Sequence, residues 1–148
     1  MTYNLHILVR FELECEVLTS RVAARELPDA WNAKVEQYLG ITPPHDGLGV
    51  LQDVHWSRGS IGYFPTYAMG NLIGGQVWAR LTEDLGDVES AMAKGEFQEI
   101  LGWLTDRIYR HGKRYTPKEL LKRVVGGPMD AGPWLAYAER KFGAIYGL

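Results

Sequence analysis

Apolar residues recur along this chain at helical spacing, and the pattern predicts a mainly helical protein. The first stretch runs from Tyr3 to Leu18 and is apolar around most of a helix circumference, so we expect that helix to be buried on most sides. Its polar positions His6, Arg10 and Glu14 are four residues apart and form one stripe. Cys15 lies among apolar neighbours, which predicts an inert thiol in the core.

The same spacing predicts further helices, and several have recognisable ends. Pro28 suits a first turn and Gly40 a C-terminal stop, while Thr116 and Glu119 are placed as the two members of a capping box. The predicted helices cover residues 28–40, 64–85, 87–94 and 96–109, a segment that starts at Thr116, and residues 133–146. We therefore expect one domain that covers residues 1–148.

Residues 40–62 do not follow helical spacing. Pro43-Pro44, Asp46-Gly47 and residues 57–60 are typical of turns, and the apolar residues within 49–56 are compatible with a short strand. An irregular segment this long inside a compact domain is usually functional or disordered, and its Trp and His residues argue against disorder. The predicted fold class is all-α with one long irregular loop, in which residues 49–56 are the candidate strand.

Composition narrows the classes of function. The 148 residues suffice for a core without disulfides or metal. No apolar run approaches about 18 residues, and the N-terminal stretch lacks a signal-peptide pattern, so we expect no membrane partner and a cytoplasmic location. A net charge of −2 argues against nucleic acid as a partner. Five Trp and eight Tyr residues are many for this length, so some of these rings are expected to line a cleft or an interface.

Charges are distributed regionally in the second half of the chain. Residues 83–99 contain six acidic residues and one lysine, whereas residues 107–123 contain seven basic residues and one glutamate. We expect solvated or mutually paired faces, and a site for an acidic partner is the alternative.

The densest candidate chemistry lies in residues 49–56 and 62–67. Asp53 can fix the tautomer of an imidazole, His55 can donate a proton, and the phenols of Tyr63 and Tyr67 are further donors. With the amide of Gln52, such a set can stabilise a developing oxyanion. The alternative is a hydrogen-bonded turn with aromatic packing. No His-Glu-x-x-His motif is present, and no two of the four histidines have helical ligand spacing, so no metal site is predicted.

Residues 49–56 match the pattern Gly-x-x-Gln-Asp-x-His-Trp at every fixed position. This pattern resembles a hallmark of the carboxypeptidase Taq (M32) family of thermostable zinc metallocarboxypeptidases. Residues 2–14, 27–32, 60–72 and 134–146 also resemble family segments, so the resemblance extends over essentially the whole chain.

The resemblance implies a gluzincin-like helical metallopeptidase fold and removal of C-terminal amino acids from peptides. The family's zinc ligands and its glutamate base belong to an HExxH region that this sequence lacks, so the chain resembles only a C-terminal portion of such an enzyme. The full-length family uses zinc, but we expect this chain alone to hold none and to be inactive, which leaves its status as an enzyme open.

The resemblance also implies roles for individual residues. His55 and Tyr63 are the expected catalytic donors to the oxyanion. Arg10 is expected to bind the carboxylate of the substrate, and a structural ion pair with Glu14 or another acidic residue is the equal alternative. Gln52 and Tyr67 are further expected substrate-binding residues. Asp53, together with Gln52, is expected to orient His55, and Trp56 is expected to pack at the groove wall. His6 is expected to be a core histidine.

Three interpretations remain open from the sequence. The chain is a fragment of an M32 carboxypeptidase, one half of a two-chain peptidase, or a non-catalytic helical dimerisation or binding module. A peptide substrate is expected only if a zinc-bearing half completes the site. Because part of a larger helical fold would expose apolar surface, we also expect self-association, with a homodimer as its simplest form.

Overall fold

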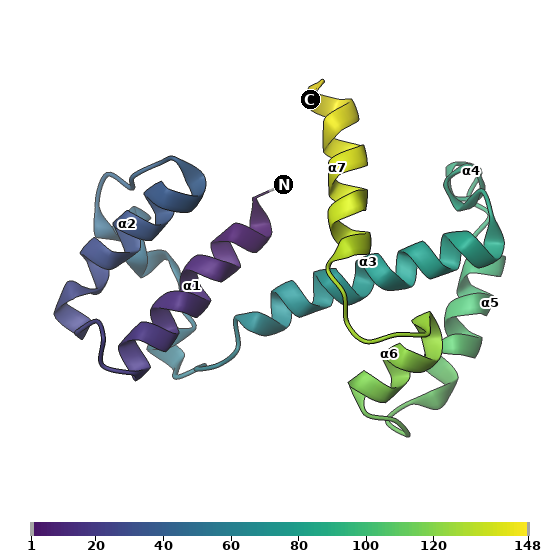
Figure 1. Ribbon diagram of the computed structural model, residues 1–148, viewed down its shortest axis with the longest axis horizontal. Helices are drawn as coiled ribbons and strands as arrows, with labels where there is room; N and C mark the ends of the chain where they lie inside the picture. Colours follow the sequence, from purple (N-terminus) through teal and green to yellow (C-terminus); the bar gives the residue numbers. More distant parts are fainter. Residues whose placement is uncertain (1, 148) are drawn as a thin grey trace. The chain divides into compact units, whose positions relative to one another are not determined.

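The computed structural model describes residues 2–147, and these residues form helices joined by turns and loops, with no strand among them (Figure 1). The α-helices are α1 (Tyr3–Leu18), α2 (Leu27–Leu39), α3 (Pro65–Leu85), α4 (Val88–Ala93), α5 (Gln98–Arg107), α6 (Pro117–Val125) and α7 (Gly132–Tyr146). Single 3-10 turns are η1 (Ala24–Glu26), η2 (Asp46–Leu48), η3 (Val50–Gln52), η4 (Trp56–Arg58) and η5 (Tyr109–His111). The predicted all-α fold class is therefore confirmed.

The helix ends follow the local chemistry that predicts them. Gly40 and Gly126 adopt left-handed φ values of 68° and 84° after α2 and α6, where a side chain would be strained. At the start of α6, Thr116 accepts from the backbone N–H of Glu119 at 3.3 Å, and the Glu119 carboxylate accepts from the backbone N–H of Thr116 at 2.9 Å. The predicted capping box is thus present.

The predicted strand over residues 49–56 is wrong. The segment consists of the 3-10 turns η3 and η4 around Asp53, and it is held by local bonds such as Gln52 N–H to the Gly49 carbonyl at 3.0 Å. A strand needs a neighbouring strand to satisfy its backbone groups, and the described residues contain none. The short apolar run therefore forms turns that satisfy these groups locally.

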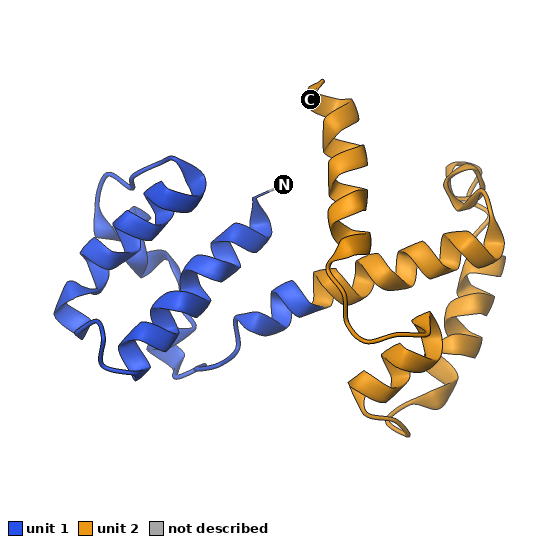
Figure 2. Ribbon diagram, in the orientation of Figure 1, with its two compact units in different colours: residues 1–69 blue, residues 70–148 orange. Residues whose placement is uncertain are grey.

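The chain divides into two compact units, residues 1–69 and residues 70–148, with α3 beginning in the first and ending in the second (Figure 2). We refer to them as unit 1 and unit 2. That residues 1–148 form one domain stays a prediction.

The core of unit 1 lies between α1, α2 and η3. Its buried residues are Val9, Leu13, Trp31, Val35 and Val50. Beside this core, Lys34 of α2 bridges two carboxylates of α1, Glu12 at 2.8 Å and Glu16 at 3.1 Å. Apolar burial and these ion pairs together fix α2 against α1.

The prediction that α1 is buried on most sides is wrong. Leu8, Phe11 and Leu18 are 39%, 40% and 62% exposed, and Cys15 between them is exposed as well, not in the core. The spacing of these four residues places them along one helix face, which we call the α1 apolar stripe. In unit 1, α2 and the 40–62 loop cover the other side of α1, and among residues 2–69 this stripe stays exposed.

Unit 2 has a separate core around α3, α4, α5 and α6. Its buried residues are Leu81, Val88, Trp103 and Val124. Asp84 accepts from the Trp103 indole at 2.8 Å and pairs with Arg80 at 2.7 Å and Arg107 at 3.5 Å. The last pair joins the acidic and basic segments, which confirms mutual pairing of charges at that point.

Two side-chain contacts connect α3 with the chain around α7. The buried amide of Gln76 donates to the Pro128 carbonyl and accepts from the Asp130 backbone N–H, both at 2.9 Å. Gly75 faces Trp134 so closely that a Cβ atom there would lie 2.7 Å from the Trp134 Cβ. A glycine at 75 is therefore required by packing. Among the described residues, no helix is both long and apolar enough to cross a bilayer.

Candidate functional site

The predicted site residues gather in unit 1, where α1, the 40–62 loop and the first turns of α3 meet. A cavity of about 340 Å³ opens there. Its lining residues are Tyr3, His6, Ile7, Arg10, Asp53, His55, Phe64 and Tyr67. The structure thus brings together residues that are up to 64 positions apart in the sequence.

A chain of charge-assisted contacts runs from α1 to the imidazole. Arg10 Nε donates to Asp53 Oδ2 at 2.6 Å, and Arg10 Nη1 donates to the His6 carbonyl at 2.8 Å. Asp53 Oδ1 accepts from the backbone N–H of His55 at 2.9 Å and also contacts His55 Nδ1. The Arg10 and Asp53 side chains are 16% and 10% exposed, so their attraction is only partly screened by water.

The charges of this chain follow from its geometry. Burial by itself would raise the pKa of Asp53, but hydrogen bonds from the His55 backbone, the Arg10 guanidinium and the His55 ring hold that pKa below its usual value. Burial, with the nearby positive charge of Arg10, lowers the pKa of His6. At neutral pH the recess therefore combines an ionised Asp53 with an uncharged His6.

His55 is also contacted at its second nitrogen and by two aromatic rings. Its Nε2 lies 3.2 Å from the Tyr67 hydroxyl, and its ring centroid lies 5.7 Å from that of Tyr63 in a stacked arrangement. The buried Phe64 ring packs against it at 4.9 Å. Burial, reinforced by the neighbouring Tyr63 phenol, raises the pKa of Tyr67, which keeps this hydroxyl protonated and able to donate.

Two predicted site residues do not face the imidazole. The exposed Gln52 amide donates to the Gly47 carbonyl within the loop. The Trp56 indole N–H donates to Glu14 Oε2 at 2.9 Å, and its ring packs edge-on against Trp31 and Phe64. The site is therefore built from Arg10, Asp53, His55, Tyr63 and Tyr67.

The structure adds three residues that sequence reasoning missed. Glu14 is only 5% exposed and accepts from both Trp56 and the backbone N–H of Gly62. Phe64 packs on the imidazole, and His6 is half-buried in the recess, so the prediction of a core histidine is wrong. The sequence did contain a signal for His6 and Glu14. They share one face of α1 with Arg10, so all three are expected to contact the same neighbouring segment.

The described residues do not fit a metal ion. Among residues 2–147 no three His, Cys, Asp or Glu side chains come close enough together to hold one. A protein zinc site uses three or four such ligands. Arg10 also neutralises Asp53 directly, so the donor set of this recess is that of a hydrogen-bonding site.

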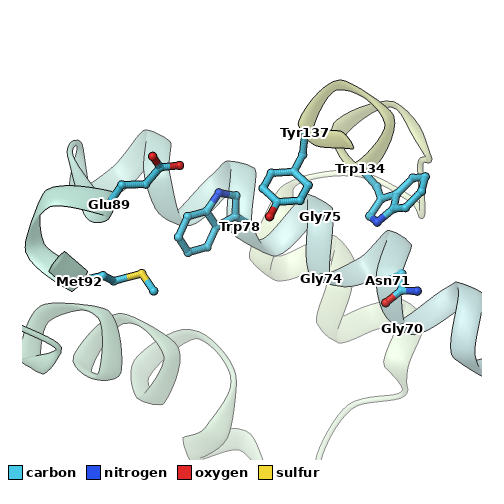
Figure 3. Close-up of a pocket in the computed structure, with 9 residues that line it drawn as sticks. All are labelled: Gly70, Asn71, Gly74, Gly75, Trp78, Glu89, Met92, Trp134 and Tyr137. Atoms are coloured by element: carbon cyan, nitrogen blue, oxygen red, sulfur yellow. The ribbon is translucent and has the colours of Figure 1, made fainter. Parts of the chain in front are cut away.

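Unit 2 contains a separate apolar cavity of about 550 Å³ between α3, α4 and α7 (Figure 3). The rings of Trp78, Trp134 and Tyr137 line it beside the open faces of Gly70 and Gly74. Some of the aromatic residues thus line clefts, as their number predicted.

Comparison with known proteins assigns this chain to a class of protein. The family profile described as Carboxypeptidase Taq (M32) metallopeptidase matches residues 1–142. The fold and the matched residues therefore define a helical metallopeptidase class, and the chain belongs to the M32 family.

Individual relatives agree with that assignment. Thermostable carboxypeptidase 1 of Thermus thermophilus is 46% identical over 147 residues, which are 99% of this chain and 29% of that protein. Carboxypeptidase 1 of Bacillus subtilis is 39% identical over 146 residues, again 99% of this chain and 29% of that protein.

Solved structures of the family have the same fold. The crystal structure of an M32 carboxypeptidase from Deinococcus radiodurans R1 matches with a TM-score of 0.96 at 45% identity, over 100% of this chain and 30% of that one. The Pyrococcus furiosus carboxypeptidase matches with a TM-score of 0.92 at 45% identity, over 95% of this chain and 28% of that one. The chain spans less than a third of the length of these relatives.

Proposed function

We propose that this chain supplies the oxyanion-stabilising and substrate-binding side of an M32 carboxypeptidase groove, for release of C-terminal amino acids from peptides. The observation that carries the proposal is the placement of His55, which contacts Asp53 through Nδ1 and Tyr67 through Nε2 and stacks on Tyr63. That these residues belong to the C-terminal portion of the family chain remains a prediction.

The proposed chemistry is donation to a tetrahedral oxyanion. Asp53 contacts Nδ1 of His55 and the Tyr67 hydroxyl lies at Nε2, so the imidazole is oriented at both nitrogens. An imidazolium donates from both ring nitrogens, and in that form Nε2 is the proposed donor to the oxyanion. Tyr63 is half exposed, and its hydroxyl is the proposed second donor. Donors that are already oriented lower the barrier because they need no reorganisation as charge develops.

The observed contacts support the three proposed substrate-binding residues to different degrees. Tyr67 lines the recess, which supports its proposed role in binding a peptide group. Arg10 already binds Asp53 and the His6 carbonyl, which supports the structural ion pair over direct binding of the substrate carboxylate. Gln52 would have to leave the Gly47 carbonyl before it could bind substrate.

We propose that the 148 residues alone are inactive. They contain no HExxH motif, and the described residues hold no cluster of metal ligands. Zinc in the full-length family would be held by the HExxH portion. The purified chain with added zinc or cobalt should therefore release no C-terminal amino acid, and robust turnover would contradict this point.

Reconstitution tests the proposed function. The chain should restore carboxypeptidase activity when mixed or co-expressed with an HExxH-bearing polypeptide of an M32 relative. In that assembly His55→Ala or Tyr63→Phe should lower kcat/KM by about 10²–10³ with zinc content unchanged, the cost of losing one oxyanion donor. Restored activity that is indifferent to both substitutions would overturn the assigned roles.

Matched controls exist for both substitutions. His45 and Tyr109 are exposed residues outside the recess. His45→Ala and Tyr109→Phe should leave kcat/KM within about twofold of the unchanged assembly, because neither side chain contacts the recess.

A second candidate function is a non-catalytic dimerisation or binding module. The α1 apolar stripe favours it, since Leu8, Phe11, Cys15 and Leu18 leave one helix face exposed. In sedimentation the chain should self-associate at tens of micromolar, and Phe11→Ser should reduce this association. A monomer at every concentration would exclude dimerisation and weaken this candidate. A cytoplasmic location and the lack of nucleic-acid and membrane partners stay predictions.

A further inference from the structure

A single buried carboxylate connects the two proposed oxyanion donors. Glu14 Oε2 accepts from the Trp56 indole N–H at 2.9 Å, and Glu14 Oε1 accepts from the Gly62 backbone N–H at 2.7 Å. Trp56 directly follows His55, and Gly62 directly precedes Tyr63. Both oxygens of one side chain on α1 are therefore used to hold the two ends of the 56–62 segment.

The environment of Glu14 makes these contacts strong constraints. Its side chain is 5% exposed, so a lost partner would leave a polar group without water. Charge-assisted hydrogen bonds of this kind are roughly twice as strong as neutral ones. Gly62 has a left-handed φ of 76°, so the backbone turns at the residue that Glu14 holds.

Arg10 and Glu14 hold the loop from two successive turns of α1. Arg10 fixes Asp53, which binds His55 from the side of its Nδ1. Glu14 fixes the far end of the same loop, from which Tyr63 stacks on the imidazole. Without Glu14 the His55 ring would keep Asp53, but the segment that carries Tyr63 would lose its attachment to α1.

We propose that Glu14 is a positioning residue that sets the mutual geometry of His55 and Tyr63. It acts on the two rings through their chain neighbours Trp56 and Gly62. The catalytic meaning of this inference rests on the proposed function, whereas the geometric claim concerns the chain alone.

The test uses NMR of the 148-residue chain, which needs no activity. In the unchanged chain we expect cross-relaxation between the His55 and Tyr63 rings and a slowly exchanging Trp56 indole proton. Glu14→Ala should abolish the ring-to-ring cross-relaxation and speed exchange of the indole proton by tenfold or more, measured below the variant's melting temperature. Persistence of both signals, with only a lower melting temperature, would show a merely structural role and overturn the inference.

Two further variants keep the test decisive if Glu14→Ala fails to fold. Glu14→Gln retains an acceptor for one of the two N–H groups, and Trp56→Phe removes one donor and retains a ring. Each should weaken the His55–Tyr63 cross-relaxation. If neither changes it, the inference is wrong.

The matched control lies on the same helix. Glu12 binds Lys34 and Tyr38 at 2.8 and 2.7 Å, away from the loop. Glu12→Gln should lower the melting temperature but leave both NMR signals unchanged. A loss of the ring contact in Glu12→Gln as well would show that general loosening of α1 is the cause, and the inference would fall.

The reconstituted assembly separates this inference from the proposed function. If Glu14→Ala disrupts the ring geometry and also lowers kcat/KM by about tenfold to a hundredfold, as expected for misplaced catalytic groups, both stand. If the geometry is disrupted and activity is unchanged, the positioning claim stands for the rings, and the roles of His55 and Tyr63 in the proposed function fail.

Discussion

Unit 1 and unit 2 are both helical, yet different forces fix their irregular segments. In unit 1, the long 40–62 loop is held to α1 by carboxylates and a guanidinium, through contacts such as Arg10–Asp53 and Glu14–Gly62. In unit 2, the helices meet over the apolar cluster around Leu81 and Trp103, and their connections are short. The 126–131 segment of unit 2 is held by the uncharged amide of Gln76, so the loop that carries the candidate chemistry is distinguished by its contacts with charged side chains.

The difference has a physical basis. Apolar packing is non-directional and tolerates small rotations of a side chain. Hydrogen bonds to charged groups specify both distance and angle. A loop whose imidazole and phenols must face one point needs the second kind of constraint. Under the proposed function, unit 1 holds the groups of this kind that the chain contributes.

The largest expected effect is on the core of unit 2. Leu81 is 2% exposed, and Leu81→Ala should lower the free energy of unfolding by roughly 2–5 kcal/mol through lost burial and the cavity left behind. Urea denaturation measures it. Leu101→Ala is the control, since that side chain is 58% exposed and should cost about 0.5 kcal/mol or less. Equal costs would mean that apolar burial does not dominate this unit.

The next largest effect is expected at the polar contact of unit 1. Arg10→Gln leaves the Asp53 carboxylate largely buried without its cation, which should cost about 2–3 kcal/mol. The control is Arg25→Gln, whose pair with Glu26 is largely exposed and should contribute under about 0.5 kcal/mol. A neutral result for Arg10→Gln would show that the loop is held by packing, as in unit 2.

Two adjacent glycines of α3 should respond with opposite signs. Gly75→Ala places a Cβ 2.7 Å from Trp134 and should destabilise by about 1–3 kcal/mol. At Gly74 the added Cβ meets open space, so Gly74→Ala should stabilise the helix by up to about 1 kcal/mol. Thermal melting of both variants measures the difference. A shift of the same sign for both would mean that α7 does not pack on α3 as described.

The smallest effect is a pH dependence of unit 1. The pKa of Asp53 is lower in the folded chain than its ordinary value of 3.8. The unfolded chain therefore binds the proton first, and the stability from ionised Asp53 is present above about pH 4 and is lost as the pH falls below that value. Asp53→Asn should flatten this acid limb in urea titrations between about pH 2 and 7. If the loss of stability at acid pH is unchanged in this variant, other carboxylates cause it.

Most of the helices could be predicted because their determinants are local. The bounds of α1 and the capping box of α6 follow from residues within a few positions of each helix end. The short strand and the buried Cys15 were wrong for one shared reason. A strand requires a partner strand, and burial requires a covering element, and neither is encoded in the segment itself.

The candidate site shows the same division. The residues Asp53, His55 and Tyr63 could be selected from the sequence by their chemistry and by the family pattern. That Gln52 bonds within the loop and that Glu14 holds both ends of the 56–62 segment could not, because these contacts depend on how the loop folds against α1.

The helices, their caps, the family and the chemistry available in one loop could be predicted from the sequence alone, because periodicity and local hydrogen bonding act over a few residues. The covered face of α1, the acid that Arg10 binds and the side chains that surround His55 became known from the folded chain. Those outcomes depend on contacts between residues more than 40 positions apart, such as Arg10 with Asp53 and Glu14 with Gly62.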